Sequence, residues 1–177
     1  MLPPLERMAQ LASSDETELY GAVSNALWMQ RELLETLLYR LAAEQLILTS
    51  GTTRWLAKAD ADLRHAVAEL RRGEVARAMH VESLAATLGL DGDPALSDLV
   101  ALAPDVWADI LADHRSALQE LAFEVQRVAD ENGRLLQAGA KAVRETLAGI
   151  GPAVHRYDAS GSAVRGNPRA MLLDEQV

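Results

Sequence analysis

Few residues in this chain have the types and spacing that chemistry requires, and the best pair is Asp62 and His65. They lie three positions apart, which places a carboxylate and an imidazole on one face of a helix. A di-iron bundle needs two Glu-x-x-His motifs and two further glutamates on facing helices. This chain offers one such motif, with Asp in place of Glu. We therefore expect Asp62 and His65 to belong to a solvated helix surface, and we predict no metal site.

The serines and glycines also lack a catalytic pattern. No serine lies in a nucleophile elbow, and the glycines form neither a phosphate-binding loop nor a dinucleotide-binding motif. The Gly149-x-Gly151 pair follows a predicted helix and is typical of a helix end. The chain has no cysteine, which excludes a thiol nucleophile, a thiolate metal site and a disulfide framework. We predict a protein that is not an enzyme, with no catalytic residue and no cofactor.

The composition favours a helical protein that binds neither nucleic acid nor a membrane. Apolar residues make up 49% of the 177 residues, which is enough for one core, and aromatic residues only 4%. The net charge of −9 would repel phosphates, and no basic stripe is present. No stretch reaches the roughly 18 uninterrupted apolar residues of a membrane span, and no signal peptide is apparent. Together with the absence of cysteine, this predicts a cytoplasmic location.

Leucines at seven-residue spacing predict two long helices. We expect the first to begin at the capping box Ser13–Glu16 and to run to about Leu48. Its inward-facing positions form two series, which are Leu27, Leu34, Leu41, Leu48 and Val23, Gln30, Leu37, Glu44. The second long helix is expected from Asp105 to about Leu147. Its inward-facing series are Leu111, Leu118, Val125, Asn132, Gly139 and His114, Leu121, Val128, Leu135, Ala142.

Two polar residues occupy inward-facing positions of the second long helix. We interpret His114 as a core imidazole with a hydrogen-bond partner, because it falls in the apolar series. Asn132 is interpreted as a residue that sets the register of a hairpin or a dimer, in preference to a ligand contact.

The segments between the long helices predict shorter elements. Residues 53–88 predict one or two shorter helices, and residues 49–53 are compatible with either a break or a continuous helix. Pro94 is expected to open a short helix that ends at Leu102, and Pro104 to open the next one.

The expected fold class is all-α, with long coiled-coil-like helices, shorter packing helices and a flexible C-terminal tail. The predicted organisation is an N-terminal lead at residues 1–14, a helical domain at 15–149 and the tail at 150–177. Glycine, serine and proline without periodicity predict that tail.

Some large apolar residues fall outside the inward-facing series. At about 100° per residue, Trp28, Tyr39 and Leu46 form a second stripe on the first helix, and Phe123 lies off the inward face of the last. For Trp28 and Tyr39 we favour burial beneath the helices of residues 53–88. The alternative is a groove that binds another protein.

Several segments within residues 18–148 resemble one known family. They are Leu19-Tyr20-Gly21 to Leu27-Trp28, Glu32-Leu33-Leu34-Glu35 to Leu38-Tyr39-Arg40-Leu41, Glu44-Gln45-Leu46-Ile47-Leu48, and Gly51 to Arg54-Trp55-Leu56-Ala57. The last helix adds Glu131-Asn132-Gly133-Arg134-Leu135-Leu136, followed by Val143-Arg144-Glu145-Thr146-Leu147. This part is similar to an Asn-x-x-Leu-Leu signature. The chain resembles the FlgN-type flagellar export chaperones, in the version found in high-GC Gram-positive bacteria.

The resemblance implies a long antiparallel helical hairpin that serves as a cytoplasmic chaperone for flagellar type III secretion. Its partners would be the C-terminal helical segments of hook-associated flagellar proteins, and then the flagellar export apparatus. The implied client groove follows the last helix, with Leu135, Leu136, Ala140, Val143 and Leu147 as candidate contacts. These side chains are equally consistent with the internal core of the hairpin.

Three further points stay open from the sequence alone. Tyr157 is a candidate contact with the export gate, by analogy with tail residues in the family. A homodimer is compatible with the pattern. The alternative class of function is a coiled-coil scaffold or adaptor without chaperone activity, which would bury its apolar stripes in a stable dimer.

Overall fold

The computed structural model describes residues 4–90, 92, 94–149, 156–157 and 163–164, with side chains described for residues 15–90, 92 and 94–149. The helices are α1 (Pro4–Ser50), the 3₁₀ helix η1 (Thr53–Trp55), α2 (Leu56–Leu88), α3 (Leu96–Leu102) and α4 (Asp105–Gly149). The strand β1 (Arg156–Tyr157) pairs antiparallel with β2 (Ala163–Val164). By internal contacts the chain divides into two compact units, residues 1–136 and 137–177. The predicted all-α fold with a long helical hairpin is confirmed.

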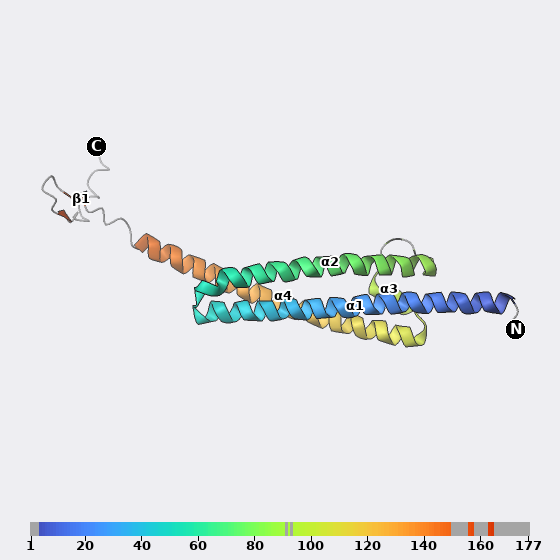
Figure 1. Cartoon of the computed structure of the whole chain (residues 1–177). Coiled ribbons are helices and arrows are strands. Elements are labelled where there is room, and N and C mark those ends of the chain that lie inside the picture. Colours follow the sequence, from blue (N-terminus) through green and yellow to red (C-terminus); the bar gives the residue numbers. More distant parts are fainter. Residues whose placement is uncertain (1–3, 91, 93, 150–155, 158–162, 165–177) are drawn as a thin grey trace, which may run out of the picture. The chain divides into compact units, whose positions relative to one another are not determined.

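The hairpin is formed by α1 and α2, which run antiparallel and are joined by a tight turn (Figure 1). The turn is made at Gly51, whose φ of 69° lies in the left-handed region that a glycine adopts without strain. The hydroxyl of Thr49 donates to the carbonyl of Gln45 at 2.9 Å, and that of Ser50 accepts from the Thr52 N–H at 3.2 Å. The helix therefore breaks at residues 49–53, the first of the two outcomes left open by the sequence.

The antiparallel partner of α1, α2, is a single helix of 33 residues. Ala59 and Ala66 are buried on its inner face, and such small side chains permit close packing against α1. The helix ends at Gly89, with a φ of 70°, and the Leu90 N–H donates to the Ala85 carbonyl at 2.9 Å. This is the hydrogen-bond pattern of a Schellman motif.

Up to Leu136, α4 runs parallel to α1. His114 is hydrogen-bonded to Ser24 and Asn132 to Leu41, so residue numbers rise in the same direction along both helices. The two long helices predicted by the heptads are thus α1 and α4, and each of them lies antiparallel to α2.

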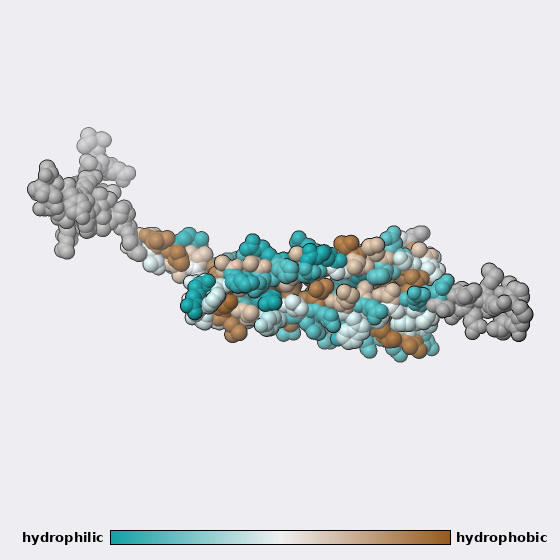
Figure 2. All heavy atoms as spheres, viewed as in Figure 1, coloured by the Kyte–Doolittle hydropathy of each residue, from teal (hydrophilic) through white to brown (hydrophobic). Residues whose placement is uncertain are grey.

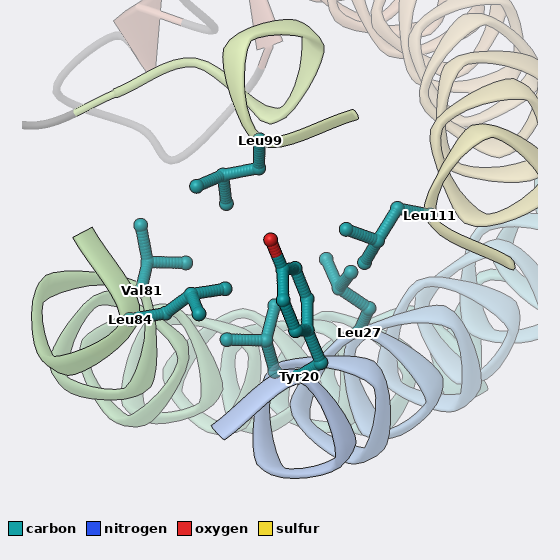
Figure 3. Close-up of a cluster of buried hydrophobic side chains, with 7 residues drawn as sticks. Tyr20, Leu27, Val81, Leu84, Leu99 and Leu111 are labelled. Atoms are coloured by element: carbon teal, nitrogen blue, oxygen red, sulfur yellow. The ribbon is translucent and has the colours of Figure 1, made fainter. Parts of the chain in front are cut away.

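Buried apolar side chains gather in two clusters along the bundle of residues 1–136. The first joins α1, α2, α3 and α4 and contains Tyr20, Val23, Leu27, Val81, Leu84, Leu99 and Leu111 (Figure 3). The second joins α1, α2 and α4 and contains Leu37, Leu41, Ala66 and Val128. The first cluster includes a residue of α3 and the second does not.

Two predicted helix starts differ from the structure. The first helix begins at Pro4 and not at Ser13, because residues 5–12 are strong helix formers and a pair of serines is tolerated inside a helix. The short helix begins at Leu96 and not at Pro94. Its first turn is capped by the carboxylate of Asp98, which accepts a hydrogen bond from the Ala95 N–H at 3.0 Å.

Candidate functional site

The inward-facing series of α4 is buried over only part of its length. Leu111, His114, Val128 and Asn132 are buried. Leu118, Leu121, Val125 and Leu135 are half-buried, whereas Gly139 and Ala142, the next members of the two series, are exposed. The heptad pattern therefore continues beyond the residues that it helps to bury.

The last turns of α4 expose an apolar face. All side chains of residues 137–149 are exposed, including Val143 at 60% and Leu147 at 65%. Ala140, Val143 and Leu147 follow the spacing i, i+3, i+7, which places them on one side of a helix. Figure 2 shows brown, apolar residues on this end of α4. Of the five predicted client contacts, Leu136 is also exposed, at 39%, and Leu135 is half-buried.

The second apolar stripe is exposed as well. Trp28, Tyr39, Leu46 and Phe123 are 52%, 64%, 71% and 74% exposed. The favoured expectation that residues 53–88 cover Trp28 and Tyr39 is wrong, because α2 packs on another side of α1. Trp28 instead contacts α4, with its ring edge-on to His114 at 5.3 Å between centroids, and Arg31 stacks on it at 4.3 Å.

A buried hydrogen bond links α1 to α4 beside Trp28. Ser24 Oγ and His114 Nε2 lie 3.0 Å apart, and both residues are buried. Burial lowers the pKa of His114, and the nearby charge of Arg31 lowers it further, while Asp113 partly opposes the shift. The interpretation of His114 as a core imidazole with a partner is confirmed.

A second buried polar contact links the same two helices further along. The side-chain amide of Asn132 donates to the Leu41 carbonyl and to Glu44 Oε2, both at 2.9 Å. Glu44 is only 6% exposed and Asn132 only 2%. Because these bonds form at one alignment of α4 against α1, Asn132 sets the register within the chain, but the helices that it aligns are the parallel α1 and α4 and not the two arms of a hairpin.

The Asp62 and His65 pair does not assemble a metal site with its neighbours. The hydrogen bond from Lys58 lowers the pKa of Asp62, and the charges of Lys58 and Arg40 lower it further, while desolvation partly opposes the shift. His65 lies 3.6 Å from Glu69. Within the residues that the structure describes, no group of three His, Asp or Glu side chains is placed to hold a metal ion.

Tyr157, the candidate for export-gate contact, lies in β1, where its backbone pairs with that of Ala163. Its side chain lies outside the described part of the chain. Among the described helices, none combines the length and the apolar character needed to cross a bilayer.

An apolar opening between α2 and α4 was not predicted from the sequence. Leu37 and Leu41 of α1 form its floor, and Leu63, Val67, Val125 and Ala129 line its sides. The sequence indicates that each helix has an inward face. The spacing of α2 from α4 depends on the packing of all three helices, so no single segment predicts the opening.

Residues 1–136 form a helical bundle that exposes large apolar side chains such as Trp28 and Phe123, and apolar helix faces are a recurring means of protein recognition. The FlgN protein family model matches residues 19–165, well over half of the chain, so the chain belongs to the FlgN family of flagellar export chaperones. No curated protein and no solved structure matches it.

Proposed function

We propose that this chain is a cytoplasmic chaperone that binds the C-terminal helical segments of hook-associated flagellar proteins before their export. The family assignment supports a role in flagellar export. The choice of hook-associated proteins as clients follows from the resemblance of the Asn132-x-x-Leu135-Leu136 segment and from the surfaces described above.

The observation that carries the proposal is the exposed apolar face at the end of α4. Val143 and Leu147 expose large apolar side chains in a helix whose other large apolar residues are mostly buried or half-buried. Burial of such a side chain is worth about 1.5–3 kcal/mol. A client helix laid along this face would cover Ala140, Val143 and Leu147 together, in a helix-to-helix contact.

The test is a binding measurement with purified hook-associated proteins and the variant Val143→Asp plus Leu147→Asp. Loss of two buried apolar contacts corresponds to about 100-fold weaker binding, at roughly 1.4 kcal/mol per tenfold. The matched control is Ala138→Asp plus Ala142→Asp. It adds the same charges to exposed positions of the same helix end, on the sides that face away from Val143 and Leu147. Circular dichroism should show that all variants keep their helices.

Equal binding by both variants would contradict the proposed contact. Failure of the wild-type chain to bind any hook-associated protein, together with a stable dimer in sedimentation analysis, would favour the scaffold function instead. Capture of hook-associated proteins from a flagellated host by the wild type and the control, but not by Val143→Asp plus Leu147→Asp, is the expected result.

We also propose that Tyr157 contributes to contact with the export apparatus. The variant Tyr157→Ala should still bind its client and should reduce secretion of that client from cells. Loss of client binding in this variant would contradict a role confined to the export step.

A further inference from the structure

One end of the bundle shows how the opening between α2 and α4 can be closed. There α3 lies over the opening, and its Leu99 is fully buried against Val81 and Leu84 of α2, Leu111 of α4 and Tyr20 of α1 (Figure 3). At this end the core therefore receives side chains from four helices. Because α3 has only seven residues, it closes only part of the opening.

Beyond α3 the opening continues without a covering helix among the described residues. It consists of two grooves of about 530 and 440 Å³ whose linings follow one another along α1, α2 and α4, and the first borders the beginning of α3 at Ala95–Ser97. Their linings extend over Leu27–Leu41 of α1, residues 63–77 of α2 and residues 115–129 of α4. Each of these stretches rises about 21 Å, at 1.5 Å per residue, which is the length of a helix of four turns.

The floor and the edges of this opening differ in chemistry. The floor is mostly apolar, with Leu27, Leu34, Leu37 and Leu41 along α1 and the polar Gln30 between the first two of them. The charged residues of the edges are Arg64, Arg71, Glu74 and Arg77 on α2 and Arg115 on α4. Four of these five are cationic, although the whole chain carries a net charge of −9.

Most of these arginines have no carboxylate partner within the described part of the chain. Arg64 is paired with Asp60 on its own helix, whereas Arg71, Arg77 and Arg115 form no ion pair with a described residue. Three unpaired guanidinium groups beside a leucine floor complement a helix that has an apolar stripe flanked by carboxylates.

We propose that an amphipathic helix of another protein, with Asp or Glu beside its apolar stripe, docks in this opening as the fourth helix of the bundle. This inference deepens the proposed function and rests on it, because the docked helix is assigned to the exported client. It adds a second contact, distinct from the exposed end of α4, and a charge preference for the client.

The charge preference separates this proposal from nonspecific attraction. A chain of net charge −9 attracts cationic peptides at long range, so general electrostatics predicts tighter binding of a basic helix. The edges of the opening predict the reverse. The probes are two labelled synthetic 14-residue amphipathic peptides with the same leucine stripe, flanked by Glu in one and by Lys in the other.

Fluorescence anisotropy with the full chain should show at least tenfold tighter binding of the Glu peptide. The variant Arg71→Glu plus Arg77→Glu should remove this preference. Its matched control, Arg54→Glu plus Arg134→Glu, changes the net charge equally at positions away from the opening and should keep the preference. Equal binding of the two peptides by the wild type, or tighter binding of the Lys peptide, overturns the proposal.

The place of binding can be measured directly, because the natural sequence has no cysteine. Single variants Ala68→Cys and Ala122→Cys put a thiol at the opening, and Ala140→Cys puts one on the exposed end of α4. The Glu peptide should slow thiol labelling at positions 68 and 122 by several-fold. Slower labelling at position 140 alone overturns the opening as the site and leaves the proposed function standing. If the Glu peptide leaves labelling unchanged at all three positions, and the wild-type chain also binds no client in the test above, both this inference and the proposed function are overturned.

The same labelling experiment tests whether the chain itself or a second copy of it fills the opening. Slow labelling at positions 68 and 122 in the free chain, independent of concentration, would show that the chain fills the opening itself. Slow labelling that develops as the concentration rises would assign it to a second copy. Either result overturns docking of a separate client helix.

Discussion

At the scale of single residues, the burial of His114 makes the stability of the bundle depend on pH. The unfolded imidazole titrates near 6.5, and its pKa in the folded chain is lower because of burial. Between these two values the unfolded chain binds a proton that the folded chain does not. The contribution of neutral His114 to the free energy of unfolding is therefore fully present above about pH 6.5 and falls as the pH drops below that value.

Thermal unfolding at pH 7.5, 6.5 and 5.5 should give a falling midpoint. In His114→Gln, which keeps a polar side chain near Ser24 without a titrating ring, the decrease should be smaller. A decrease of the same size in both proteins would assign the effect to other groups.

Replacement of Asn132 should destabilise the fold more than replacement of an ordinary polar residue. Its replacement by Leu leaves the buried carboxylate of Glu44 without its amide donor, which should lower the free energy of unfolding by about 2–3 kcal/mol. The double variant Asn132→Leu plus Glu44→Leu should lose less than the sum of the two single changes, because no buried charge is left unpaired. Urea unfolding of all four proteins measures this coupling, and strict additivity would contradict it.

The sequence predicted the positions of these buried polar residues but not their partners. His114 and Asn132 fall in heptad positions, which is a local signal. Ser24 and Glu44 are 90 and 88 residues away from them, and only the parallel alignment of α4 with α1 brings them together. The direction of a helix leaves no trace in its periodicity, so the pairing had to come from the structure.

At the scale of elements, replacing a glycine inside a helix by alanine should change the stability of the chain differently at different positions. A Cβ at position 133 of α4 meets no atom within 4 Å, so Gly133→Ala should stabilise the chain by about 0.5–1 kcal/mol through helix propensity. At position 73 of α2 the new Cβ would lie 2.6 Å from Leu33 Cδ1, so Leu33 must move and the gain should be lost. Equal gains in thermal unfolding would contradict this close contact between α1 and α2.

The helices themselves were largely predictable, and their ends and neighbours were less so. Leu27, Leu37 and Leu41 are buried as their spacing predicts, because a 3.6-residue period fixes which side chains share a face. Trp28 and Tyr39 were expected under α2 and are exposed. The inner face of α2 carries the small residues Ala59 and Ala66, which give a weak hydrophobic pattern and conceal the side on which α2 packs.

At the scale of the molecule, the two units should differ in amide hydrogen exchange. Residues of α1, α2 and α4 that line the two apolar clusters should exchange slowly, because opening them requires unfolding of the bundle. Residues 137–149 of α4, whose side chains are all exposed, should exchange much faster. Mass spectrometry of exchanged peptides tests this contrast, and similar protection on both sides of Leu136 would contradict it.

Bound client should change this exchange pattern in a defined way. On the proposed function, protection at residues 137–149 rises when a client helix covers Val143 and Leu147. On the further inference, residues 63–77 and 115–129 gain protection as well. The heptads predicted the helical class of the whole chain, but no sequence pattern distinguishes these two surfaces, because both consist of ordinary leucine, valine and alanine positions.

The parallel run of α1 and α4 also affects how the chain assembles during synthesis. The α1 and α2 hairpin closes around a local turn at Gly51 and is complete in sequence by Leu88, whereas the hydrogen bonds from Ser24 and Leu41 to α4 span 90 and 91 residues. Contacts close in sequence form first. We therefore expect α1 and α2 to emerge and pair before α4 has been synthesised, which leaves the leucines of α1 that α4 covers exposed to solvent. Until α4 has packed, the nascent chain exposes more apolar surface than the folded protein and should therefore be more prone to aggregation.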